Sequence, residues 1–223
     1  MPGSGGNTIG GNLDHWRSSR DDPDSNIDFM DLEAQVKYYE DLLEPIAPPK
    51  VDIDPMMPGF SLSNERLLDD RNTFNERIER ALEDRYEEEF FTVLLVDIDH
   101  FTKLNSSYGF PTGDNLLQIV SRLIAKSMRN ADVVAHLGGD KFALFLPDTQ
   151  ATGGRIAAER VRALVKQGNI TLGTLRINSS VSIGGVTVDD LHPFTESDEL
   201  WKQLRSVVEG AKKTGRNRVA WQR

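Results

Sequence analysis

Residues 133–147 read VVAHLGGDKFALFLP, in which two short apolar runs stand on either side of Gly138-Gly139-Asp140-Lys141. Each run, 133–137 and 142–146, has the length of a short β-strand. The Gly pair between them permits the positive φ angles that a tight turn requires. The segment therefore predicts a β-hairpin that carries Asp140 at its tip.

Outward from the hairpin, helical and strand patterns alternate along the chain. Residues 64–85 have apolar side chains at helical spacing and lead into 90–98, a β-rich run typical of a buried strand. Further helices are predicted over 113–129, opened by Gly113 and Asp114, over 151–167 and over 199–214. Strand patterns occupy 175–188 and 218–221. This alternation predicts an α/β or α+β sandwich.

Composition narrows the class of protein. A chain of 223 residues with 38% hydrophobic residues can form one domain with an extension. Because there is no cysteine, disulfides and thiolate metal sites are excluded, and a reducing, cytoplasmic location is expected. The net charge of -9 disfavours nucleic-acid binding, and no apolar run reaches the roughly 20 residues that membrane insertion requires.

The N-terminal quarter of the chain differs in composition from the rest. Residues 1–30 are rich in Gly, Ser, Asn and Asp, which predicts a disordered leader. Within 31–44, apolar residues recur at alternating spacings of four and three, typical of either a short coiled-coil dimer seam or an amphipathic helix packed on its own domain. Five prolines in 45–59 indicate a semi-rigid linker. The main domain is then predicted to occupy residues 60–223.

Acidic residues are placed where strands of the predicted sheet end. Asp97 and Asp99 follow the buried strand, and Asp140 lies at the hairpin tip. Carboxylates at adjacent strand ends can converge, and hard oxygen ligands of this kind suit Mg²⁺ together with substrate phosphates. Taken singly, each could equally be a solvated turn residue.

A longer ordered series of residues decides between these readings. It consists of Asp97-Ile98-Asp99-His100-Phe101, Asn105, Gly109, Gly113-Asp114, Leu117, Gly138-Gly139-Asp140-x-Phe142, Val181-Ser182-Ile183-Gly184 and Ala211-Lys212-x-x-Gly215-Arg216-Asn217. In order and spacing, this series resembles the GGDEF domain, the nucleotide-binding fold of diguanylate cyclases. The resemblance covers roughly residues 64–221 and implies a nucleotidyl-cyclase-like palm, with a central, mostly antiparallel sheet flanked by helices.

The resemblance also implies a reaction and its residues. In this family two GTP-loaded domains meet, and each 3′-hydroxyl attacks the α-phosphate of the opposing GTP to form cyclic di-GMP. Asp97 and Asp140, with the Ile98 carbonyl, would hold Mg²⁺, which is implied only when GTP is bound. The implied GTP contacts are the backbone near Phe101, Lys212 and Arg216 at the phosphates, and Asn105 and Asp114 at guanine.

One position of the signature departs from the family pattern. The fourth residue, usually Glu, is Lys141, at or beside the implied metal site. At ~4 Å and an effective dielectric of about 20, one such pair of unit charges is worth about 4 kcal/mol. If Lys141 points toward Asp140, its ammonium competes with Mg²⁺; if it points to the other strand face, the metal ligand stays usable. The sequence leaves this direction open.

Further positions also differ from the family. Thr102 stands where Lys is usual, His136 where Arg is usual, and Arg205 and Glu209 replace the usual Asp and Tyr.

Arg129-Asn130-Ala131-Asp132, by contrast, keeps the R-x-x-D form of the family's inhibitory site and its separation from the signature. Arg129 would bind phosphate and guanine, and Asp132 would accept from guanine.

Two main hypotheses follow. The first is a degenerate GGDEF domain that acts as a cyclic di-GMP receptor or effector in bacterial second-messenger signalling, binding through Arg129 and Asp132. The alternative is an active or weakly active, Mg²⁺-dependent diguanylate cyclase with product inhibition at the same site. A domain that binds GTP without turnover is a third reading. A signalling protein or a second copy of the chain is the expected protein partner.

Overall fold

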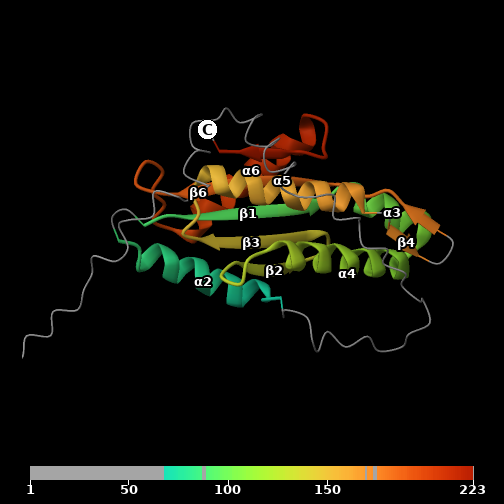
Figure 1. Cartoon of the computed structure of the whole chain (residues 1–223), viewed down its shortest axis with the longest axis horizontal. Helices are drawn as coiled ribbons and strands as arrows, with labels where there is room; N and C mark the ends of the chain where they lie inside the picture. Colours follow the sequence, from blue (N-terminus) through green and yellow to red (C-terminus); the bar gives the residue numbers. More distant parts are fainter. Residues whose placement is uncertain (1–67, 87–88, 169, 173–174, 223) are drawn as a thin grey trace, which may run out of the picture. The chain divides into compact units, whose positions relative to one another are not determined.

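The computed structural model describes residues 68–86, 89–168, 170–172 and 175–222 (Figure 1). The predicted leader at 1–30, the helix at 31–44, the linker at 45–59 and the domain start at residue 60 all lie outside these residues, so they stay predictions. The described residues all belong to one unit, Pro45–Arg223.

A five-stranded sheet forms the centre of this unit, with the strand order β2-β3-β1-β6-β7. All neighbouring strands are antiparallel except β6 and β7, which are parallel. The expected mostly antiparallel sheet is confirmed. Its strands are β1 (Phe91–Ile98), β2 (Val133–Gly138), β3 (Lys141–Pro147), β6 (Val181–Val188) and β7 (Val219–Trp221), and a separate hairpin pairs β4 (Ile170–Leu172) with β5 (Leu175–Ile177).

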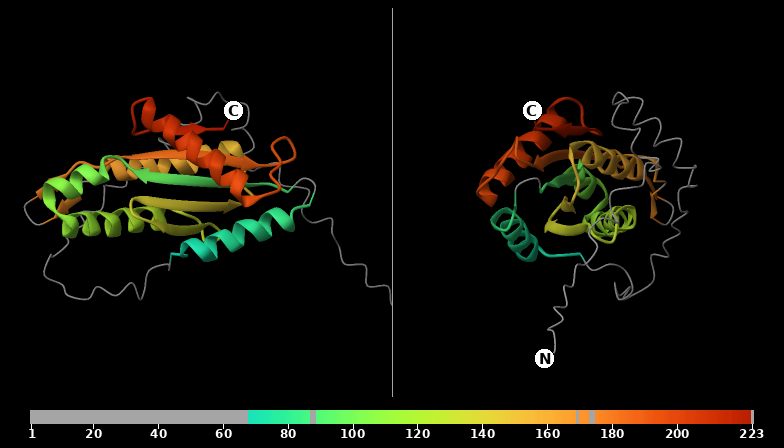
Figure 2. Two further views of the ribbon diagram at one scale, coloured as in Figure 1. Left: turned by 180° about the vertical axis from the view of Figure 1, so that it is seen from behind. Right: turned by 60° about the vertical axis from the view of Figure 1, so that its left-hand side comes forward.

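Helices cover both faces of the sheet. Figure 2 shows α4 and α5 on one face and α2 and α6 on the other. The described helices are α2 (Arg71–Glu83), α3 (Phe101–Tyr108), α4 (Phe110–Ser127), α5 (Ala151–Gln167) and α6 (Ser197–Lys213). None of them is both long and apolar enough to cross a bilayer.

Strand β1 lies in the middle of the sheet and is buried on both faces, as its unbroken apolar run predicts. Leu94, Val96 and Ile98 belong to the core under α4 and α5. Leu95 belongs to the second core, under α2 and α6. Because side chains alternate along a strand, Asp97 falls on the same face as Leu95, toward α6.

The β2–β3 hairpin forms as predicted. Gly138 and Gly139 have φ angles of 95° and 59°, in the region that glycine adopts without strain. The Arg71 guanidinium donates two hydrogen bonds to the Leu137 carbonyl, at 2.6 and 3.2 Å. Helix α2 thereby holds the hairpin that carries Asp140 and Lys141.

The structure differs from the predicted elements between strands β1 and β2. Helix α3 was not predicted, because it is only eight residues long and none of its residues is fully buried, although Phe101 and Leu104 pack partly against the core. Helix α4 begins at Phe110 and ends at Ser127, not at the predicted Gly113 and Arg129, since Gly109 and Pro111 start it one turn earlier. Helix α5 has the predicted bounds, and α6 lies within two residues of them.

Candidate functional site

The ends of β1 and β3 bring the predicted metal ligands together. Asp97 pairs with Lys141 across the two antiparallel strands, and the Ile98 backbone N–H donates to the Asp140 carbonyl at 3.0 Å. The three residues expected to hold Mg²⁺, Asp97, Ile98 and Asp140, therefore lie at one corner of the sheet.

Lys141 points into this corner. Its Nζ lies 2.6 Å from Asp140 Oδ1 and 3.2 Å from Asp97 Oδ2. Residues directly opposite each other in an antiparallel pair share a face, which places Lys141 on the face of Asp97. The side chain of Asp97 is only 3% exposed, whereas that of Lys141 is 46% exposed. The direction that the sequence left open is therefore toward the carboxylates.

A second ammonium reaches Asp97 from helix α6. Lys212 Nζ lies 2.7 Å from Asp97 Oδ2 and 3.2 Å from Glu209 Oε1. Burial disfavours the charge on both lysines. Hydrogen bonds and opposite charges outweigh this effect of burial. They come from Asp140 and Asp97 for Lys141, and from Asp97 and Glu209 for Lys212. The pKa of each ammonium is therefore raised above its usual value. Both lysines thus stay charged at neutral pH.

The arrangement does not fit Mg²⁺ as these side chains lie. One oxygen of each expected side-chain ligand, Asp97 Oδ2 and Asp140 Oδ1, is already held by a lysine ammonium. At ~4 Å and an effective dielectric of about 20, a dication and an ammonium repel by about 8 kcal/mol. Within the described residues, no group of three or more His, Cys, Asp or Glu side chains is placed to hold a metal ion.

Asp99 does not join the metal corner, although the sequence suggested that it could. Its Oδ1 accepts from Ser182 Oγ at 2.6 Å, and its Oδ2 accepts from Ser180 Oγ at 2.6 Å and from the Asn217 backbone N–H at 3.0 Å. Asp99 is buried, and these donors satisfy it. It therefore ties the end of β1 to β6 and to the turn that contains Arg216.

A pocket of about 520 Å³ adjoins the corner and gathers the predicted phosphate contacts. Helix α3 begins beside it, so the unpaired backbone N–H groups of its first turn lie near the cavity. Lys103, the residue after Thr102, also lines the pocket and supplies a cation to it. The sequence alone did not single out this lysine. The lining residues are Asp97, Ile98, Asp99, His100, Phe101, Thr102, Lys103, Ser106, Asp140, Lys212 and Arg216.

The two residues expected to read guanine, Asn105 and Asp114, do not line this pocket. The Asn105 side chain lies against Gly113, where an added Cβ would come 1.9 Å from Asn105 Oδ1. That amide oxygen is buried without a hydrogen-bond partner. Asp114 is exposed and is not the cap of α4, since Gly109 holds that position. Guanine recognition by these two residues stays a prediction.

The R-x-x-D residues form a turn between α4 and β2. Asp132 is buried, and its Oδ2 accepts from the Arg129 backbone N–H at 2.7 Å, while the Arg129 side chain is exposed. Arg160 on α5 joins them: burial, followed by the charge of Arg129, lowers its pKa, and Asp132 opposes this shift. The Nε of Arg160 is buried without a partner.

Sequence reasoning missed Arg160. Its position within 151–167 carries no motif, and only the packing of α5 against the α4–β2 turn brings it to Arg129 and Asp132.

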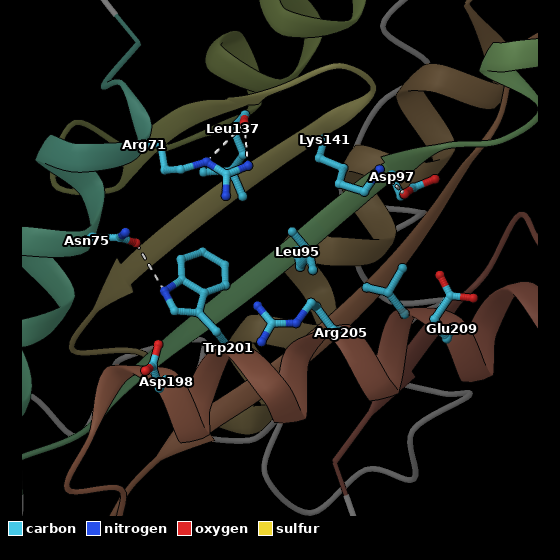
Figure 3. A pocket seen from close by; sticks show the side chains of 11 residues that line it. Arg71, Asn75, Leu95, Asp97, Leu137, Lys141, Asp198, Trp201, Arg205 and Glu209 are labelled. Atoms are coloured by element: carbon cyan, nitrogen blue, oxygen red, sulfur yellow. Dashed lines mark hydrogen bonds and ion pairs between the residues drawn. The ribbon is translucent and has the colours of Figure 1, made fainter.

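A second pocket, of about 330 Å³, lies on the other side of Lys141, between α2 and α6. Figure 3 shows Lys141 directed toward Asp97 at one end of it and Trp201 reaching from α6 toward Asn75. Trp201 Nε1 donates to Asn75 Oδ1 at 3.1 Å. Arg205 and Glu209, the two α6 residues that depart from the expected pattern, both line this pocket.

Comparison with known proteins identifies the family. The family described as "Diguanylate cyclase, GGDEF domain" matches residues 67–218. The chain belongs to the GGDEF family. Cyclases of this family use GTP and Mg²⁺ and act in cyclic di-GMP signalling.

Several curated relatives are named diguanylate cyclases. The chain is 33% identical over 133 residues to the probable diguanylate cyclase DgcT of Escherichia coli (strain K12), a match that covers 58% of this chain and 28% of DgcT. It is 33% identical over 131 residues to diguanylate cyclase A of Treponema denticola, covering 59% of this chain and 35% of that protein. The match thus spans about a third of these relatives, and their names favour the cyclase hypothesis over the receptor hypothesis.

Solved GGDEF structures share the fold. The GGDEF domain of PA1120 (YfiN or TpbB) from Pseudomonas aeruginosa matches with a TM-score of 0.65 and 28% identity, over 70% of this chain and 97% of that chain. The GGDEF domain of DgcB from Caulobacter crescentus, in complex with c-di-GMP, matches with a TM-score of 0.63 and 22% identity, over 77% and 98% of the two chains. Diguanylate cyclase SiaD of Pseudomonas aeruginosa, in complex with its activator SiaC, matches with a TM-score of 0.63 and 25% identity, over 70% and 59%.

Proposed function

We propose that this GGDEF domain is a receptor or effector that binds cyclic di-GMP and does not synthesise it. The observation that carries this proposal is the Lys141 ammonium, 2.6 Å from Asp140 Oδ1 and 3.2 Å from Asp97 Oδ2. These carboxylates are the expected Mg²⁺ ligands, and the ammonium groups of Lys141 and Lys212 already neutralise them. In this proposal Gly138-Gly139-Asp140-Lys141-Phe142 is a degenerate signature.

The proposed cyclic di-GMP site consists of Arg129, Asp132 and Arg160. A guanidinium can bind phosphate through two parallel hydrogen bonds, and Arg129 exposes its guanidinium at the surface. Arg160 has a buried Nε–H without a partner, a donor that a bound anion would satisfy. Burial lowers the pKa of Arg160, and the nearby charge of Arg129 adds to this effect, so two guanidinium groups lie close enough to act on one ligand.

Calorimetric titration of cyclic di-GMP into the full chain tests this site. Arg129→Ala is expected to weaken binding at least about tenfold, because it removes charge-assisted hydrogen bonds to the ligand. Lys126→Ala is the matched control: it removes an exposed cation from the last turn of α4, just before the turn that carries Arg129, and is expected to leave affinity unchanged. Absence of cyclic di-GMP binding to the unmodified chain would refute the proposal.

A diguanylate cyclase is the second candidate, favoured by the names of the relatives and by the retention of Asp97, Asp140, Lys212 and Arg216 around one pocket. Incubation with GTP and Mg²⁺ or Mn²⁺, followed by chromatography, separates the two candidates. We expect no cyclic di-GMP from the unmodified chain. Product formation by the unmodified chain would establish the cyclase instead, and product formation by Lys141→Glu alone would assign the loss to this one residue.

The remaining parts of the proposal concern the cellular setting. A receptor needs a protein through which to act, so we propose a signalling partner or a second copy of the chain, with the helix predicted at 31–44 as one candidate contact. GTP is proposed as a second ligand. A cytoplasmic location is proposed from the sequence.

A further inference from the structure

We propose that the Lys141 ammonium is a built-in replacement for the divalent cation, so that this domain binds the phosphates of a nucleoside triphosphate without metal. This inference rests on the part of the proposed function in which Lys141 displaces Mg²⁺. It is separate from cyclic di-GMP binding at Arg129, and the two can fail independently.

The position of the ammonium supports this role. Lys141 Nζ contacts one oxygen of Asp140 and one of Asp97, which are the two side chains expected to share a metal. The pairing of Asp97 with Lys141 in the β1–β3 register fixes this cation at the corner. An ammonium has three N–H donors, so contact with two carboxylates leaves one donor for a phosphate oxygen.

The charge of the site leads to the same conclusion. Replacing Glu by Lys at one position changes the local charge by two units, which equals the charge of one divalent cation. With His100 neutral, the phosphate pocket has three cationic and three anionic lining residues, and Lys141 adds a fourth cation beside it. A Glu at position 141 would leave an excess of anions, which a metal ion would have to reverse before a polyphosphate could enter.

The remaining cations of the pocket are placed for the phosphates. Lys103 and Arg216 line the pocket from the start of α3 and from the turn after α6. Among the described residues, neither Lys103 nor Arg216 forms an ion pair with a carboxylate. Lys141 and Lys212, by contrast, neutralise Asp97 and Asp140. The hydrogen bond from the Asn217 N–H to Asp99 holds the turn that presents Arg216.

Nucleotide binding in excess EDTA tests the inference. Inorganic tripolyphosphate and GTP are titrated separately into the full chain, with EDTA or with Mg²⁺. We expect both to bind in EDTA, with affinities within about threefold of those in Mg²⁺. The tripolyphosphate titration isolates the phosphate pocket from guanine recognition.

Variants at position 141 identify the residue responsible. Lys141→Met, which removes the charge but keeps a long side chain, is expected to lower the affinity in EDTA at least about tenfold. Lys141→Glu is expected to bind GTP only when Mg²⁺ or Mn²⁺ is added. Lys213→Met is the matched control: it neutralises an exposed lysine of α6 and is expected to bind like the unmodified chain.

Three outcomes would overturn the inference: no binding of either ligand to the unmodified chain, binding that requires divalent metal, or EDTA-resistant binding that survives Lys141→Met. Cyclic di-GMP titration of the same variants distinguishes the two proposals. Unchanged cyclic di-GMP affinity with lost triphosphate binding locates the effect at the phosphate pocket. Loss of both ligands in Lys141→Met would indicate a folding defect, which circular dichroism of the variant detects. In that case GTP binding by Lys141→Glu, compared with and without added metal, decides whether the inference holds.

Discussion

At the scale of single residues, the charge arrangement of the site depends on the side chains that form ion pairs with Asp97. Its buried carboxylate receives two ammonium groups, Lys141 from the neighbouring strand and Lys212 from α6. Breaking one partner of a buried ion pair leaves an uncompensated charge, so the two lysines do not contribute independently. Asp99, two residues on, has a separate set of three donors and a structural role.

The raised pKa of Lys141 leads to a prediction about pH. A lysine whose pKa is raised in the folded state stays protonated beyond its unfolded pKa of about 10.4, and its ion pairs weaken only as the pH rises through the folded value. The ammonium should therefore exclude metal equally at pH 7 and pH 9. We expect Mn²⁺ binding, followed by electron paramagnetic resonance, to stay weak across this range.

The control for this prediction is Lys141→Met, which should bind Mn²⁺ more tightly than the unmodified chain at both pH values. An affinity of the unmodified chain that rose about tenfold per pH unit would contradict the prediction, because it would mean that Lys141 loses its proton in this range.

At the scale of elements, the seating of helix α6 on strand β6 places Lys212 at Asp97. Gly184 makes this contact possible, because an added Cβ would lie 2.7 Å from Val208 Cγ2 and 2.8 Å from the Val208 backbone nitrogen. Strand β6 is buried along its whole length, so the helix cannot move outward without exposing apolar surface. The close approach of α6 to β6 therefore depends on the absence of a side chain at Gly184.

Gly184→Ala is expected to destabilise the domain by about 2–3 kcal/mol, because the new methyl group overpacks against the backbone of α6. Urea unfolding followed by circular dichroism measures the difference. Gly210→Ala, in α6 itself, is the opposite case: an added Cβ there meets nothing within 4 Å, so alanine should stabilise the helix by about 1 kcal/mol. If Gly184→Ala were as stable as the unmodified chain, the proposed packing would be wrong.

At the scale of the whole described domain, the two proposed ligand sites lie at opposite ends of strand β2. Asp132 precedes Val133 at one end, and the hairpin with Lys141 follows Gly138 at the other. At about 3.3 Å per residue, the strand separates the sites by roughly 20 Å. This exceeds the Debye length of about 8 Å at physiological salt, so a charge change at one site should have little direct effect on the other.

Arg129→Ala is therefore expected to leave triphosphate affinity unchanged, and Lys141→Met to leave cyclic di-GMP affinity unchanged. The double variant should show both losses, additive to within about 0.5 kcal/mol. Calorimetry on the three variants and the unmodified chain measures this. A coupling energy well above that value would show that the two sites communicate through the sheet.

The sequence by itself determined the fold. The apolar run of β1 and the Gly pair of the hairpin are local features, because strand patterning and turn geometry are set by neighbouring residues. Helix α3 was missed because it is short and none of its residues is fully buried.

Only the tertiary structure decided how the charged residues of the site pair with one another. The direction of Lys141, the reach of Lys212 to Asp97, the role of Asp99 and the approach of Arg160 to Arg129 all depend on strand register and helix packing between residues far apart in the chain. No local pattern specifies such contacts. A one-residue change of strand register would turn Lys141 to the opposite face.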